Sequence, residues 1–126
     1  MTSNSPPPQL SAQAVVTSSF SFEAAHYLPG HPGKCHDLHG HSYKIEVSVS
    51  GPISPNGMVV DFSDIERVVN EVIVKRWDHK LLNDTLENPT AENIAATALC
   101  LLHEAGLDAS KIKLFETTDG WVEVYR

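Results

Sequence analysis

Residues 40–50 constrain the fold of this chain more than any other segment, because their apolar and polar side chains alternate almost without a break. A repeat of two residues is typical of a β-strand with one side buried and the other in solvent. The apolar side consists of Tyr43, Ile45, Val47 and Val49, and the polar side of Ser42, Lys44, Glu46, Ser48 and Ser50. His39 and His41 fall in register with the apolar side, so both imidazoles are expected to face the protein interior.

Another strand is predicted earlier in the chain, over residues 15–25. A loop rich in proline and glycine connects it to the strand at residues 40–50. Its even-numbered positions share one side, which comprises Val16, Phe20, Phe22, Ala24 and then His26. If the two strands pair as a hairpin, this side faces inward and His26 lies near His39 and His41. Three imidazoles on one ion leave a fourth position open, which is typical of a catalytic zinc site. The alternative is that the histidines are buried residues that only satisfy backbone carbonyls.

Two helices are predicted downstream. Apolar residues recur at helical spacing over residues 63–76, where Ser63 and Glu66 form a capping-box pattern. A second helix is predicted to have Thr90 as its N-cap and to stop at Gly106.

Two short strands, residues 111–117 and 121–125, complete the pattern on either side of a hairpin turn at Asp119 and Gly120. The predicted order is therefore ββααββ. It indicates an α+β fold in which two helices pack on one face of an antiparallel sheet.

The length of 126 residues favours a single domain, predicted over residues 14–126. Residues 1–13 are rich in serine and proline and are expected to form a disordered tail. A net charge of −7 argues against nucleic-acid binding, and no apolar run suggests a membrane segment. Without a secretory signal pattern, a cytoplasmic location is expected. In that compartment Cys35 and Cys100 are expected to be free thiols, with Cys100 packed inside its helix.

Six motifs, in this order, resemble the 6-pyruvoyl-tetrahydropterin synthase family. They occupy residues 22–26, 35–43, 57–62, 78–84, 88–92 and 116–117. The resemblance spans residues 19–126 and implies the tunnelling fold (T-fold), in which such units assemble through their sheets into a ring. It also implies a homo-oligomer, commonly a hexamer made of two stacked trimers, with active sites at the subunit interfaces.

Three residues separate Cys35 from His39, and this spacing resembles the 6-carboxy-5,6,7,8-tetrahydropterin synthases of queuosine (7-deazapurine) biosynthesis. Those enzymes convert 7,8-dihydroneopterin triphosphate to 6-carboxytetrahydropterin and release acetaldehyde and triphosphate. Two alternatives stay open. One is formation of 6-pyruvoyl-tetrahydropterin, by triphosphate elimination without carbon–carbon cleavage, and the other is a non-catalytic zinc-binding domain.

The resemblance implies a role for each site residue. His26, His39 and His41 would bind Zn²⁺, Cys35 would abstract a proton, and Asp78 with His79 would form a second acid–base pair. Glu116 would anchor the pterin through two parallel N–H donors of the ring, assisted by the hydroxyl of Thr117. Two simpler interpretations remain: Cys35 as a small buried residue, and Glu116 in solvent if its strand ends at Phe115.

Overall fold

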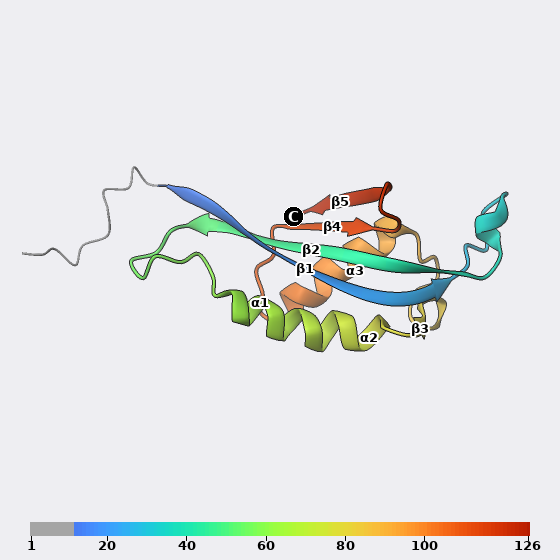
Figure 1. Ribbon diagram of the computed structural model, residues 1–126, viewed down its shortest axis with the longest axis horizontal. Coiled ribbons are helices and arrows are strands. Elements are labelled where there is room, and N and C mark those ends of the chain that lie inside the picture. Colours follow the sequence, from blue (N-terminus) through green and yellow to red (C-terminus); the bar gives the residue numbers. More distant parts are fainter. Residues whose placement is uncertain (1–11) are drawn as a thin grey trace, which may run out of the picture.

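The computed structural model describes residues 12–126, which form a five-stranded sheet with helices on one face (Figure 1). Its largest element is a hairpin of β1 (Gln13–His26) and β2 (His39–Pro52). The strands pair antiparallel without interruption from Gln13 opposite Pro52 to His26 opposite His39. The predicted hairpin is confirmed, and each strand extends slightly beyond its predicted range.

The strands lie in the order β3-β1-β2-β4-β5. β4 (Lys111–Phe115) pairs antiparallel with β2, and β5 (Trp121–Tyr125) pairs antiparallel with β4. β3 (Lys80–Leu81) pairs parallel with β1, so the sheet is not purely antiparallel as predicted. The sequence pattern did not reveal β3, because two residues are too few to show a repeat. β4 ends before Glu116, whose N–H already bonds to the Gly120 carbonyl across the hairpin turn.

The first helical segment is continuous and comprises α1 (Phe62–Val69), a π-helical stretch (Asn70–Val74) and α2 (Lys75–Trp77). The predicted capping box of Ser63 and Glu66 is wrong. The N-cap is Asp61, whose carboxylate accepts hydrogen bonds from the backbone N–H and the hydroxyl of Ser63, both at 2.8 Å. These bonds, the backbone N–H first, hold the pKa of Asp61 below its usual range, so the cap is charged at neutral pH.

α3 (Ala91–Glu104) begins as predicted, because the Thr90 hydroxyl accepts a hydrogen bond from the N–H of Asn93 at 3.1 Å. It ends in a Schellman motif, which pairs the N–H of Gly106 with the His103 carbonyl and the N–H of Leu107 with the Leu102 carbonyl. Gly106 has a φ of +89°, a left-handed conformation that favours glycine. Two 3₁₀ turns complete the structure: η1 (Lys34–His36) and η3 (Leu82–Asp84).

Replacing Gly106 with alanine is expected to lower the free energy of unfolding by about 1 kcal/mol, since a Cβ disfavours the left-handed conformation. The added Cβ would meet no described side chain within 4 Å, so the loss comes from the backbone alone. Urea unfolding measures it. Gly106→Asn should lose less stability, because asparagine tolerates this conformation better. Equal losses for both variants would contradict this explanation.

The core lies between the sheet and the helices, and its centre is aromatic. The Phe22 and Tyr43 rings stack at 5.2 Å between centroids, and Trp77 packs on Phe22 at 5.9 Å. The predicted apolar side of β2 is fully inside: Tyr43, Ile45, Val47 and Val49 are buried. The hairpin therefore aims its inward histidines at one end of this core.

The cysteines, the predicted N-terminal tail and the lengths of the helices were also addressed by the sequence predictions. Cys35 and Cys100 are free thiols, as predicted, but Cys100 is exposed rather than packed because α3 turns other positions inward. Of the predicted tail, residues 1–11 lie outside the described part, and Gln13 already belongs to β1. Within residues 12–126, every helix is too short or too polar to cross a lipid bilayer.

Candidate functional site

Three histidines meet at one end of the β1–β2 hairpin. His26 ends β1 directly opposite His39, which starts β2, and His41 is the next inward position of β2. The Nε2 atoms of His26 and His39 lie 3.0 Å apart, and the ligand atoms of all three rings lie within 4.8 Å of one another. Pairwise ring centroids are 4.5–5.1 Å apart. The structure therefore brings together the three residues that the sequence pattern had grouped.

Backbone carbonyls fix the tautomers of two of these rings. The Nδ1 of His26 lies 2.8 Å from the Pro89 carbonyl, and the Nδ1 of His39 lies 2.7 Å from the Asp37 carbonyl. A carbonyl only accepts, so both Nδ1 atoms carry the proton and donate it. In the neutral form of each ring Nε2 then carries no proton, and the two Nε2 lone pairs face each other across 3.0 Å, which is unfavourable unless a cation lies between them.

His41 completes the set with a nitrogen that lacks a partner. Its Nε2 is buried and makes no hydrogen bond within residues 12–126. Burial lowers the pKa of His41, the nearby Glu116 carboxylate raises it in part, and His26 and His39 lower it further. The ring is therefore neutral at physiological pH, the form in which imidazole binds metals.

These observations fit a divalent metal ion. Two carbonyl-oriented imidazoles and one buried, unpartnered imidazole nitrogen supply three neutral donors to one point, as in catalytic zinc sites. The alternative, that the histidines only satisfy backbone carbonyls, accounts for one nitrogen of His26 and one of His39. It leaves the buried Nε2 of His41 unexplained.

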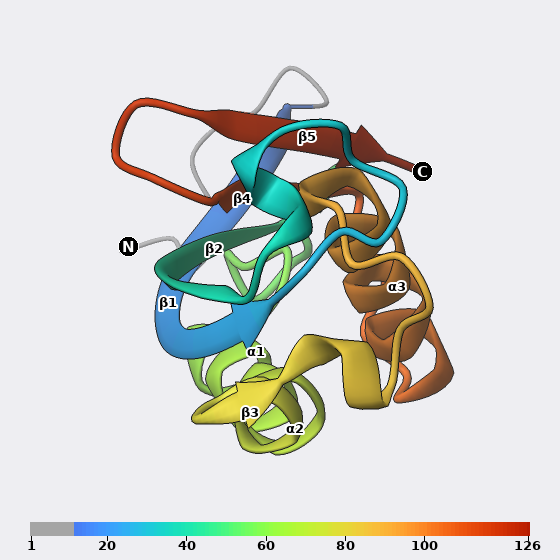
Figure 2. The ribbon, with the colours of Figure 1, turned by 90° about the vertical axis from the view of Figure 1, so that its right-hand side faces the viewer.

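A cavity of about 350 Å³, called here the site pocket, adjoins these histidines through Glu116. Its lining residues come from three segments: the β1–β2 loop, the start of α3 and the β4–β5 hairpin. The ribbons of these segments can be followed in Figure 2. Its lining consists of Leu28, His31, Cys35, Thr90, Ala91, Glu92, Glu116, Thr117, Gly120, Trp121 and Val122. Cys35, Glu116 and Thr117 thus share one cavity, although they are far apart in the sequence.

Glu116 is neither in a strand nor in open solvent. Its side chain is 29% exposed, and its Oε1 lies 3.5 Å from the Nε2 of His41. The strand predicted for residues 111–117 ends at Phe115, as in the simpler interpretation, yet the Glu116 carboxylate still turns toward the histidines. The Thr117 hydroxyl oxygen accepts hydrogen bonds from the N–H groups of Gly120 at 3.0 Å and Asp119 at 3.3 Å. Thr117 therefore holds the hairpin turn, and its own proton is free for a ligand.

Asp78 and His79 lie elsewhere, beside β3 at the other edge of β1. The Asp78 carboxylate accepts a hydrogen bond from the Glu23 N–H at 2.9 Å and lies 3.1 Å from the Nδ1 of His79. The hydrogen bond from Glu23 is the main reason why the pKa of Asp78 is lowered, and His79 adds to it. His79 has a φ of +59°, a strained conformation of the kind that occurs at functional sites.

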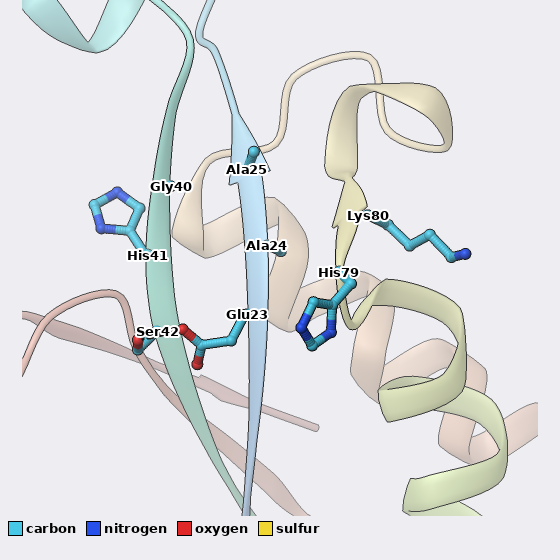
Figure 3. A pocket seen from close by; sticks show the side chains of 8 residues that line it. All are labelled: Glu23, Ala24, Ala25, Gly40, His41, Ser42, His79 and Lys80. Carbon is cyan, nitrogen blue, oxygen red and sulfur yellow. Dashed lines mark hydrogen bonds between the residues drawn. The ribbon is translucent and has the colours of Figure 1, made fainter.

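A groove of about 450 Å³ runs over the ends of β1, β2 and β3 (Figure 3). Figure 3 shows His41 and His79 on opposite sides of the β1–β2 pair. Within residues 12–126, neither Asp78 nor His79 hydrogen-bonds to any of the three histidines. The groove is lined by both His41 and His79, whereas Cys35 and Glu116 line the site pocket, so the candidate site residues adjoin two different cavities.

Sequence reasoning missed the residues that hold these groups in place. Glu23 accepts a hydrogen bond from the Ser42 hydroxyl at 2.5 Å, and its carbonyl accepts one from the His79 N–H at 2.6 Å. Asn83 joins the end of β1 by two hydrogen bonds to the backbone of Tyr27. These contacts link positions more than fifty residues apart or cross between strands, so no local pattern could have revealed them.

Comparison with known proteins identifies the family to which this chain belongs. Residues 15–126 match the family model described as 6-pyruvoyl tetrahydropterin synthase, and the chain belongs to this family. The predicted family resemblance is thus confirmed. A solved structure of Caenorhabditis elegans 6-pyruvoyl tetrahydropterin synthase superposes with a TM-score of 0.82 at 24% identity, covering 91% of this chain and 96% of that one. This likeness confirms the predicted tunnelling fold.

Two relatives are more informative about the branch of the family. The chain is 37% identical to the 6-carboxy-5,6,7,8-tetrahydropterin synthase of Haemophilus influenzae, over 86% of this chain and 96% of that protein. It is 46% identical to an Archaeoglobus fulgidus protein provisionally given the same name, over 90% of this chain and 97% of that protein.

Proposed function

We propose that this chain is a zinc-dependent 6-carboxy-5,6,7,8-tetrahydropterin synthase. It would convert 7,8-dihydroneopterin triphosphate to 6-carboxytetrahydropterin, release acetaldehyde and triphosphate, and serve queuosine or 7-deazapurine biosynthesis. The observation that carries the proposal is a set of three neutral imidazoles next to a pocket that contains a thiol and a carboxylate. The names of the two relatives and the three residues between Cys35 and His39 support this branch of the family.

Two residues of the site pocket, Glu116 and Cys35, have defined tasks in this proposal. Glu116 accepts two parallel hydrogen bonds from the N3–H and 2-amino group of the pterin, which orients the ring. Cys35, in its thiolate form, removes a proton from the substrate side chain. Bound to His26, His39 and His41, Zn²⁺ would polarise the oxygens of that side chain.

The second acid–base group is the pair formed by Asp78 and His79. The ionised Asp78 holds the Nδ1 proton of His79 and leaves its Nε2 to accept or return a proton. The pair does not line the site pocket, and Figure 3 shows His79 on the opposite side of the β1–β2 pair from His41. We propose that a second copy supplies the acid–base pair, in a homo-oligomer such as a hexamer of two trimers.

The products decide between this function and its alternatives. Purified, zinc-loaded protein incubated with 7,8-dihydroneopterin triphosphate is expected to release acetaldehyde and 6-carboxytetrahydropterin in equal amounts, measured by an aldehyde-trapping assay and mass spectrometry. Release of triphosphate with 6-pyruvoyl-tetrahydropterin and no acetaldehyde would instead favour the pyruvoyl-forming activity. Zinc binding without any turnover would favour a non-catalytic domain.

A further inference from the structure

We propose that His31 binds the phosphate chain of the substrate at the rim of the site pocket. This inference rests on the proposed function. None of the residues with a role in that function binds the phosphate chain of the substrate. The site pocket has two carboxylates in its lining, Glu92 and Glu116. His31 is the only side chain of that lining that can carry a positive charge. A polyanionic substrate needs such a donor, because phosphate oxygens only accept hydrogen bonds.

The His31 ring is oriented for this contact. Its Nδ1 accepts a hydrogen bond from the Gly33 N–H at 2.9 Å, so the proton of the neutral ring is on Nε2. Within residues 12–126 this is the only hydrogen bond of the ring, and the exposed Nε2–H is available to a ligand. Gly33 also packs closely against the ring: a Cβ added there would lie 3.1 Å from its Cε1.

The β1–β2 loop holds His31 and Cys35 in one wall of the pocket. The Leu28 N–H bonds to the Cys35 carbonyl at 2.9 Å, and the His31 N–H bonds to the Leu28 carbonyl at 3.0 Å. Glu116 belongs to a different wall, at the end of β4. In the proposed binding mode the pterin ring contacts Glu116 and the side chain of the substrate lies at Cys35. The phosphates at the end of the substrate side chain then lie toward the loop and His31.

The structure provides room beyond His31 for a long chain of phosphates. A second cavity of about 410 Å³ lies next to the site pocket and shares Leu28, His31 and Thr90 with it. His31 thus stands at the boundary between the two cavities. Lys34, a permanent cation in the same loop, lines neither of them and provides a matched control.

Binding of two oxidised pterins that differ only in phosphate tests the inference without turnover. Zinc-loaded His31→Ala is expected to bind neopterin triphosphate about tenfold more weakly than the wild type, the usual loss for one hydrogen bond to a charged group. Its affinity for neopterin should be unchanged, and Lys34→Ala should match the wild type with both ligands. Fluorescence titration of the three proteins with the two ligands measures all six affinities. An equal loss for both ligands, or no loss in His31→Ala, would overturn the inference.

Gly33→Ala gives a second test that keeps His31 in place. Gly33 has an extended backbone with a φ of −106°, which alanine adopts freely, so the main effect is to displace the His31 ring. Neopterin triphosphate binding should weaken severalfold in Gly33→Ala but not weaken further when this change is added to His31→Ala. Additive losses would overturn the inference. The proposed function fails separately, if the wild type binds both pterins but releases no acetaldehyde from the dihydro substrate.

Discussion

His41→Ala is expected to weaken zinc binding by at least about a hundredfold, as measured by competition with a chromophoric chelator. Loss of a hydrogen-bond partner behind a ligand already costs about 10–100-fold, and this change removes the ligand itself. His41 is the informative position, since its Nε2 is buried without a partner among the described residues. The Glu116 carboxylate lies 3.5 Å from this nitrogen but makes no hydrogen bond with it, so the change tests the proposed metal site directly.

His36→Ala is the matched control for His41→Ala, because His36 is a histidine five residues earlier in the chain that is exposed and lies outside the cluster. It should bind zinc as the wild type does. Chelation should lower the melting temperature of the wild type and of His36→Ala, since an ion that binds only the folded state stabilises it. Wild-type zinc affinity in His41→Ala would refute the three-histidine site.

Cys35→Ala and His79→Ala are each expected to lower kcat by about 10²–10⁴-fold, the range for loss of a positioned acid or base. Both variants should retain zinc, because neither residue belongs to the histidine cluster. Steady-state acetaldehyde release and metal analysis measure the two properties. Unchanged turnover in Cys35→Ala would remove the thiol from the mechanism.

Mixing these two inactive variants tests whether sites form between copies. If Cys35 of one subunit works with His79 of another, a reassociated mixture contains some sites with both residues intact. Activity should then return in part when the subunits are exchanged under mild denaturation, but not when either variant is treated alone. A mixture that stays inactive, although mass spectrometry shows mixed oligomers, would place the pair outside the shared site.

The histidine cluster could be predicted from the sequence because its geometry is local to one hairpin. The two-residue repeat of β2 fixed the direction of His39 and His41, and the matching repeat of β1 brought His26 opposite them. Only the pairing of adjacent strands had to be assumed. The N-cap of α3 was equally accessible, because a threonine cap acts within three residues.

The features that were missed depend on contacts distant in sequence. The position of Asp78 and His79 follows from hydrogen bonds to Glu23, fifty-five residues earlier for Asp78. The cap of α1 was misplaced for a different reason: Asp61 and Ser63 are both good cap residues, and only the observed direction of their hydrogen bond separates them. A sequence pattern cannot choose between two such residues as the N-cap, since aspartate and serine have nearly equal propensities for that position.

The uninterrupted pairing of β1 with β2 makes the histidine cluster intolerant of length changes. One residue inserted or deleted between Phe20 and His26 would shift the pairing by a single step and invert the sides of the strand beyond it. His26 would then point into solvent while His39 and His41 stayed inside. Natural variation in length should therefore collect in the connecting loop, where residues can be added without reversing any ligand.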